Sequence, residues 1–192
     1  DIFGSRGLGD VYKRQYNKFL NPETLDKAYN FAVKAHENQK RHSGDPYVIH
    51  PVAVANILTE LKLDSATIAT GLLHDTIEDT HATYQTIKQE FGQEVADLVE
   101  GVTKISELEN QAKANSRAEN FRKLIIATSK DIRVLLVKIA DRLHNMRTIH
   151  SIDKQEKKER IARETMEIYS PLADRMGMNR ICLLYTSDAA DD

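Results

Sequence analysis

Apolar residues recur along most of the chain at the spacing of helices. From Pro22 to about Asn38 they fall on one helical face, at Leu25, Ala28, Tyr29, Ala32 and Ala35. Asn21 is a favourable N-cap, and proline is well suited to the first helical position after it. The pattern therefore predicts a first helix that begins at Pro22.

The same reasoning predicts further helices separated by polar segments. A second helix is expected from Pro51 to about Leu61, and a third, capped by Asp64, runs into His74. Later helices are expected near residues 84–91, 93–102, 118–128, 132–148 and 154–169. The segment 40–49 is rich in turn-forming residues and predicts a loop. The polar segment 107–116 is expected to be mobile.

Composition supports an all-α fold. The chain has no tryptophan and only 8 glycines and 4 prolines among 192 residues, whereas alanine, leucine, isoleucine, lysine and glutamate are abundant. It contains no long apolar run of the kind that spans a membrane. These features indicate one helical, cytoplasmic domain with no membrane partner.

The two ends of the chain differ from the rest. The strings SRGLGDVYKRQ (5–15) and CLLYTSDAADD (182–192) match translated transposase sequencing adapters. We therefore expect residues 1–15 and 182–192 to be adapter-derived artefacts around a domain at 16–181, the alternative being a genuine loop and tail. Both the single cysteine and the whole net charge of −2 lie in these ends, which hold three basic and five acidic residues. A neutral domain is not expected to bind nucleic acids generally.

One short motif places an imidazole and three carboxylates directly after an apolar run. His74-Asp75-Thr76-Ile77-Glu78-Asp79-Thr80 follows residues 68–73. Burying such groups is costly unless a partner compensates their charge, and a bound cation is the natural one. If the helix continues, His74 aligns with Glu78 and Asp75 with Asp79. The pattern predicts that His74 and Asp75 hold an ion while Glu78 and Asp79 orient or deprotonate a water bound to it.

Two other segments can supply the remaining ligands. His50 lies in YVIHP (47–51) and Asp141 in KIADRLHN (138–145), each at the edge of an apolar segment. Imidazole and carboxylate ligands without thiolates suit a divalent first-row metal. Alternatives stay open, since His50 could be a helix-entry residue, Asp141 could pair with a neighbouring arginine, and His144 could be a buried histidine or a competing ligand.

Four motifs in order resemble the hydrolase domain of the RelA/SpoT family, within the superfamily of HD metal-dependent phosphohydrolases. They are RHSGDPYVIHP (41–51), GLLHDTIEDT (71–80), GVTKI (101–105) and KIADRLHNMRT (138–148). The resemblance implies an all-α HD-domain helical bundle that hydrolyses the stringent-response alarmones guanosine tetraphosphate and pentaphosphate. In addition, residues 169–181 resemble the exit from this domain in long members, in which a synthetase domain follows.

The resemblance also implies roles for the residues that match the family's motifs. Four of them correspond to the metal ligands, for which manganese is the usual ion: His50, His74, Asp75 and Asp141. Glu78 and Asp79 correspond to the acidic pair needed for hydrolysis. Because this chain has all six residues, we expect a competent hydrolase that releases pyrophosphate from the 3′ position and leaves GDP or GTP.

An anionic nucleotide must be bound by local cations, because the domain is neutral. Arg41 is the candidate for stacking on the base, and Ser43 and Asn145 can offer a hydroxyl and an amide for orientation. The matching loop and helix form the nucleotide pocket in the related hydrolases. Lys138 is expected to reach a phosphate, although it could instead neutralise a neighbouring carboxylate.

Two other functions stay open at this point. One is a small stand-alone HD phosphohydrolase that acts on alarmone or on another phosphorylated nucleotide. The other is a sensor module that binds alarmone without turnover, a role for which Glu78 and Asp79 would not be needed. The presence of both acids favours the hydrolase.

Overall fold

The computed structural model describes residues 20–41, 43–111, 125–126, 128 and 130–178. The predictions for residues 1–15 and 182–192, and most of the helix predicted at 118–128, lie outside these ranges. Within them the secondary structure is helical, and the one β-feature is an isolated bridge between Lys40 and Pro46. The predicted all-α class is confirmed. No helix in this part of the chain is long and apolar enough to cross a membrane.

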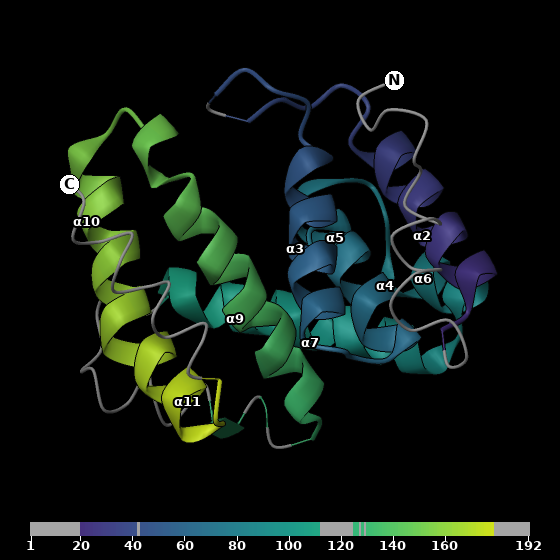
Figure 1. Ribbon diagram of the computed structural model, residues 1–192. Coiled ribbons are helices and arrows are strands. Elements are labelled where there is room, and N and C mark those ends of the chain that lie inside the picture. The colour runs from purple at the N-terminus through teal and green to yellow at the C-terminus, as the bar shows by residue number, and fades with distance from the viewer. Residues whose placement is uncertain (1–19, 42, 112–124, 127, 129, 179–192) are drawn as a thin grey trace.

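The helices follow the predicted order. They are α2 (Pro22–Ala35), α3 (Ile49–Glu60), α4 (Ser65–Leu73), α5 (Thr76–Asp79), α6 (Tyr84–Phe91), α7 (Gln93–Gln111), α9 (Ile132–Arg147), the 3₁₀-helix η2 (Ile149–Ser151), α10 (Gln155–Glu164), the π-helix η3 (Thr165–Tyr169) and α11 (Ser170–Arg175). Helices α2 to α6 form one group and α10 to α11 another, with α9 between them (Figure 1). Helix α7 packs against α4, α6 and α9.

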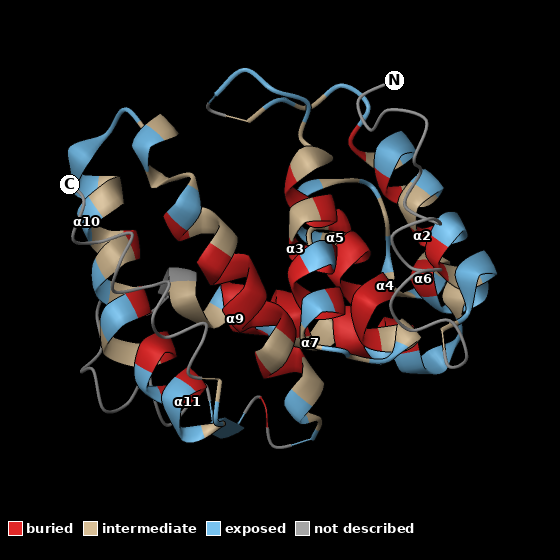
Figure 2. Cartoon of the chain, in the orientation of Figure 1, coloured by how far each residue is buried: buried red, intermediate tan, exposed pale blue. Residues whose placement is uncertain are grey.

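Side-chain caps fix where several helices begin. The predicted caps are confirmed, because the side chain of Asn21 accepts a hydrogen bond from the Thr24 amide and that of Asp64 from the Thr67 amide. Buried residues concentrate where α3, α4, α7 and α9 meet (Figure 2). The starts of the helices are thus set locally, whereas their positions are set by this shared core.

Two predicted boundaries are wrong. Helix α3 begins at Ile49 rather than Pro51, so His50 belongs to its first turn. The helix predicted at 93–102 continues to Gln111, into the polar segment 107–116, whose remaining residues lie outside the described part. Polarity misled this second prediction, because Glu109 is held by buried cations of α9 and not by solvent. Tertiary contacts stabilise a helix end that looks like a loop in the sequence.

Helices α3 and α4 approach each other closely at Gly71. A Cβ atom added there would lie 2.5 Å from Cδ1 of Leu58 and 3.5 Å from Cα of Ala55. Glycine therefore lets the backbone of α4 pack directly against α3. This contact brings together the helix that carries His50 and the helix that leads into His74.

Candidate metal centre and active site

The helix that leads into the acidic motif stops inside it. Helix α4 ends at Leu73, and α5 begins at Thr76, so His74 and Asp75 form the junction. The hydroxyl of Thr76 donates to the Leu73 carbonyl at 2.6 Å, and such side-chain bonds compete with helical ones. The continuous helix assumed for aligning His74 with Glu78 is therefore not present. The two predicted ligands lie at the break, and the two acids lie on the short helix after it.

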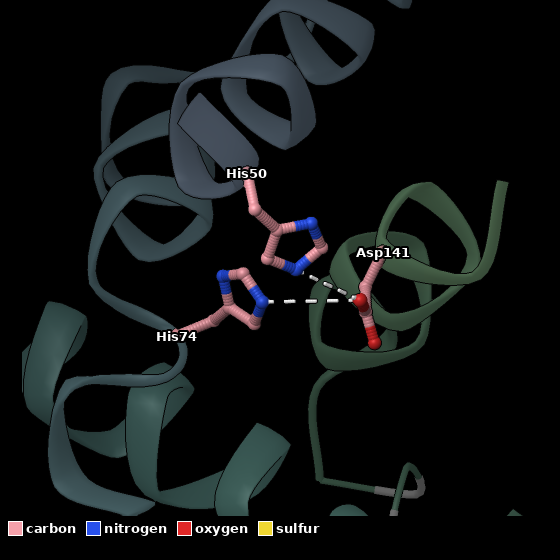
Figure 3. Close-up of side chains that lie close together, drawn as sticks. All are labelled: His50, His74 and Asp141. Atoms are coloured by element: carbon pink, nitrogen blue, oxygen red, sulfur yellow. Dashed lines mark ion pairs between the residues drawn. The ribbon is translucent and has the colours of Figure 1, made fainter. Parts of the chain in front are cut away.

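The four predicted metal ligands nevertheless converge from three parts of the chain. His50 comes from α3, His74 and Asp75 from the junction, and Asp141 from the middle of α9. Donor atoms of His50, His74 and Asp141 all lie within 4.8 Å of one another (Figure 3). Nε2 of His50 lies 3.2 Å from Oδ1 of Asp141 and 3.6 Å from Oδ2 of Asp75. Nε2 of His74 lies 3.1 Å from Oδ1 of Asp75.

The orientation of the His74 ring suits a metal ligand. Its Nδ1 faces the Gly71 carbonyl at 2.8 Å, so the proton there is donated to the backbone and Nε2 is left to bind. That Nε2 atom is buried and has no hydrogen-bond partner of suitable geometry, although a carboxylate oxygen is near. A buried nitrogen aimed at two carboxylates fits an ion between them.

The charges of the cluster support the same conclusion. Burial opposes ionisation of these groups, but Asp75 and Asp141 raise the pKa of His74 to about 9, so a metal ion at Nε2 would replace a proton there. The pKa of His50 is lowered by burial. Despite their burial, Asp75 and Asp141 have pKa values below the ordinary range, because the histidines and, for Asp141, Lys138 favour the charged carboxylates. The two carboxylates stay charged and attract positive charge to the space between them.

Tyr47 joins the ligands to the catalytic candidates. Its hydroxyl lies 2.8 Å from Oδ2 of Asp75 and 2.8 Å from Oδ2 of Asp79. Burial and the two aspartates raise the pKa of Tyr47 well above its ordinary value, so it stays a donor. Glu78, beside Asp79 on α5, is exposed, but partial removal of its carboxyl group from water and the charge of Asp75 raise its pKa. The sequence interpretation left Tyr47 out, because nothing local shows which carboxylates it meets.

A polar cavity of about 310 Å³ lies over these groups. Its walls include the acidic motif, the loop before α3, helix α9 and, across from them, η2 and α10. Of the predicted site residues, all but Ser43 and His74 line it: Arg41, His50, Asp75, Glu78, Asp79, Lys138, Asp141 and Asn145. The cavity therefore gives a bound molecule access both to the proposed metal ligands, called the ligand cluster below (His50, His74, Asp75 and Asp141), and to the acidic pair Glu78 and Asp79.

The residues predicted to bind substrate differ in whether their polar groups face the cavity or are bound to other protein groups. Nη2 of Arg41 donates to Oδ1 of Asn145 at 3.2 Å, and Nδ2 of Asn145 donates to Oδ1 of Asp141 at 2.7 Å. Both side chains thus stand at the cavity wall next to the ligand cluster. Ser43, by contrast, is exposed and donates to Asp45. Lys138 is buried, and its ammonium group binds protein groups, as described below.

Comparison with known proteins agrees with this geometry. A model of the HD domain matches residues 28–179. The chain belongs to the HD domain family. It is 57% identical over 165 residues to the GTP pyrophosphokinase rsh of Brucella melitensis, covering 86% of this chain and 22% of that protein. It is 58% identical over 157 residues to the bifunctional (p)ppGpp synthase/hydrolase SpoT of Escherichia coli K12, covering 82% and 22%.

These relatives belong to the RelA/SpoT type, and the chain spans about a fifth of their length. A third relative, from Escherichia coli O157:H7 and 58% identical, is named guanosine-3′,5′-bis(diphosphate) 3′-pyrophosphohydrolase. The HD domain also aligns with a solved structure described as that of a metazoan ortholog of SpoT that hydrolyzes ppGpp. The TM-score is 0.67 at 24% identity, covering 88% of this chain and 94% of the other, which supports the fold.

Proposed function

We propose that this chain is the hydrolase domain of a RelA/SpoT-type enzyme, which removes the 3′-pyrophosphate of guanosine tetraphosphate or pentaphosphate with Mn²⁺ bound at the four ligands. The observation that carries the proposal is the convergence of His50, His74, Asp75 and Asp141 beside an acidic pair. All of these residues except His74 line one cavity. The names of the relatives supply the substrate.

In the proposed reaction, water adds to the phosphorus bonded to O3′, and the O3′–P bond breaks to leave GDP or GTP and pyrophosphate. An ion held by His50, His74, Asp75 and Asp141 would lower the pKa of a bound water and polarise a phosphoryl oxygen. Glu78 and Asp79 orient the water and accept its proton, and Tyr47 holds Asp79 in place. Arg41 and Asn145 orient the nucleoside end. Lys138 reaches a phosphate only if it leaves Asp141 and Glu109.

The decisive experiment measures pyrophosphate release from guanosine tetraphosphate by this chain, with Mn²⁺ and with the metal chelated. Release that requires Mn²⁺ and disappears in Asp75→Ala is the expected result. Binding of the nucleotide without release would favour the sensor module. Faster release of phosphate or pyrophosphate from a different phosphorylated nucleotide would favour a small HD phosphohydrolase of other specificity.

The organisation of the whole protein is a separate proposal. Residues 16–181 form the hydrolase domain, residues 1–15 and 182–192 come from adapter sequence, and a synthetase domain follows in the intact protein. The support is the sequence of the two ends and the much greater length of the relatives. Sequencing the intact gene tests it, and finding both end strings encoded there would reject the adapter origin.

A further inference from the structure

Beside the four proposed metal ligands lies a group of largely buried charges, whose central carboxylate the proposed reaction does not use. Its centre is Glu109, near the end of α7. One oxygen of Glu109, Oε1, lies 2.7 Å from Nη2 of Arg142 and accepts a hydrogen bond from the hydroxyl of Tyr169. The other oxygen, Oε2, lies 3.2 Å from Nζ of Lys138. Burial opposes the charge of Glu109, but Lys138 and Arg142 lower its pKa below the ordinary value.

Lys138 connects this carboxylate to a proposed metal ligand. Its Nζ lies 3.1 Å from Oδ2 of Asp141 and 3.0 Å from the hydroxyl of Ser106. The other oxygen of Asp141, Oδ1, faces Nε2 of His50 at 3.2 Å. Lys138 therefore occupies one oxygen of Asp141 and turns the other toward the histidines. Lys138 on Oδ2 and Asn145 on Oδ1 together set the orientation of Asp141, which therefore depends in part on where Lys138 is held.

Glu109 is the partner of Lys138 that lies outside the proposed metal centre and carries a negative charge. Lys138 and Arg142 lie one helical turn apart on α9, and both are buried. Two buried cations repel each other, and removing the partner of a buried charge is strongly unfavourable. Without Glu109, the ammonium group of Lys138 would lose one of the two carboxylates that pair with it, and only Asp141 would remain. Its ammonium group would then bind the carboxylates of the ligand cluster in competition with an ion.

The far side of Glu109 is fixed by an unusual turn. Residues 165–169 form a π-helix between α10 and α11. Such turns are rare in proteins, and those that occur often lie at functional sites. The turn places Tyr169, which is 1% exposed, with its hydroxyl on Glu109 and its ring 5.2 Å from the guanidinium carbon of Arg142. Arg142 is also held by Glu164 at the end of α10. Glu109 is thus anchored from two directions.

We propose that Glu109 is a positioning residue for the metal centre. It acts through Lys138 on Asp141, and Arg142 and Tyr169 hold it in place. The proposal rests on the proposed function in one respect, namely that Asp141 is a metal ligand. It adds that the affinity for the ion depends on a carboxylate that does not touch the ion.

The test compares Mn²⁺ affinities of the full chain by calorimetric titration, in the unaltered protein and in Glu109→Gln. The glutamine keeps the size of the side chain but not its charge. We expect the affinity to fall about tenfold or more, as is usual when a group behind a ligand is lost. Excess Mn²⁺ should restore much of the turnover of guanosine tetraphosphate. Glu100→Gln is the matched control, because Glu100 pairs with Lys104 on the exposed side of the same helix.

A purely structural role predicts a different result. Glu109→Gln would then lower the thermal midpoint while the folded protein kept the Mn²⁺ affinity of the unaltered chain, and this outcome would overturn the proposal. If Glu109→Gln does not fold, Tyr169→Phe decides, because it removes a single hydrogen bond to Glu109. A fewfold loss of affinity supports positioning, and unchanged affinity rejects it.

The titration needs no substrate, so it separates this proposal from the proposed reaction. A chain that binds Mn²⁺ but does not hydrolyse the nucleotide would contradict the reaction, while the comparison of affinities would still decide the role of Glu109. A chain that binds no Mn²⁺ at all would overturn both.

Discussion

Glu78 and Asp79 are neighbours in the chain, but their surroundings differ. Asp79 is held by the hydroxyl of Tyr47, and its backbone carbonyl accepts from Gln39 at 2.6 Å. Glu78 has a pKa raised by partial removal of its carboxyl group from water and by Asp75. A raised pKa makes a carboxylate a stronger proton acceptor, whereas Asp79 is already bound by the hydroxyl of Tyr47. Of the two acids, Glu78 is therefore the better candidate for the general base, and Asp79 for orienting the water.

Replacing Glu78 by glutamine should lower kcat by about two to four orders of magnitude, the usual contribution of an acid–base group. Mn²⁺ affinity should stay close to that of the unaltered chain, because Glu78 is not one of the proposed ligands. Steady-state kinetics at saturating Mn²⁺ and a metal titration check the two statements. Glu60→Gln, at the exposed end of α3, is the control. Full activity in Glu78→Gln would remove this residue from the reaction.

Replacing Tyr47 by phenylalanine should lower kcat by about tenfold, because a hydrogen bond to charged carboxylates is lost. The fold should be retained, since the ring can still stack on His36 at 4.6 Å. Tyr84→Phe is matched to it, because Tyr84 also donates to an aspartate, Asp97, but does not line the cavity. Equal kinetic effects of the two substitutions would contradict a specific role for Tyr47.

At the scale of elements, helix α4 has a capping residue at its start and a proposed metal ligand directly after its end. Asp64 caps its first turn, and His74 follows its last. Asp64 also forms an ion pair with Arg133 at 2.7 Å. The stability of this short helix thus controls where one proposed ligand lies.

Asp64→Ala should lower the free energy of unfolding by about 1 kcal/mol, the typical cost of losing a cap. It should also weaken Mn²⁺ binding slightly, because the end of α4 becomes less ordered. Urea denaturation and a metal titration measure the two effects. Thr83→Ala, which removes the cap of α6, serves as control and should change stability alone. Equal Mn²⁺ affinities in the two variants would show that the cap does not act on the metal centre.

The same residue predicts a dependence of stability on pH. Partial burial opposes the charge of Asp64, but hydrogen bonds from Thr67 and Arg133 outweigh it and lower its pKa. Because the pKa of Asp64 is lower in the folded state, its charged form stabilises the fold at pH values above the unfolded-state pKa of about 4. This stabilisation is lost as the pH falls through the pKa of the folded state. Between pH 6 and pH 3, the free energy of unfolding measured with urea should therefore fall less in Asp64→Ala than in the unaltered chain. Parallel curves would contradict this.

Secondary structure was predictable where local chemistry decides it. The caps Asn21 and Asp64 follow from short-range hydrogen bonds, which a sequence displays directly. The break at His74 depends on side-chain bonds to backbone carbonyls, and the helical end of α7 depends on cations of α9. The candidate ligands could be named from their motifs, whereas Tyr47 and Glu109 could not, because their partners lie far away in the chain.

At the scale of the whole molecule, the proposed ligands join helices that are distant in sequence. His50, His74 and Asp141 each belong to a different packed segment. An ion that binds only the folded chain stabilises it by mass action, by about 2.7 kcal/mol at a concentration 100 times its Kd. Binding of the ion and folding are therefore expected to be coupled.

Mn²⁺ should accordingly raise the thermal midpoint, and a chelator should reverse the rise. His74→Ala should remove most of the effect, while His81→Ala, an exposed histidine of the same region, should leave it unchanged. Differential scanning calorimetry with and without Mn²⁺ provides the measurement. A midpoint that is insensitive to Mn²⁺ in the unaltered chain would argue against an ion that joins the three segments.

The missing side chain at Gly71 has a consequence for how such proteins can diverge. Because a Cβ atom there would collide with Leu58, the sizes of these two residues are linked. In a descendant that acquires alanine at position 71, the end of the Leu58 side chain must move to another rotamer, or a shorter residue must replace it. We therefore expect the two positions to change together during evolution, although neither one touches the ion.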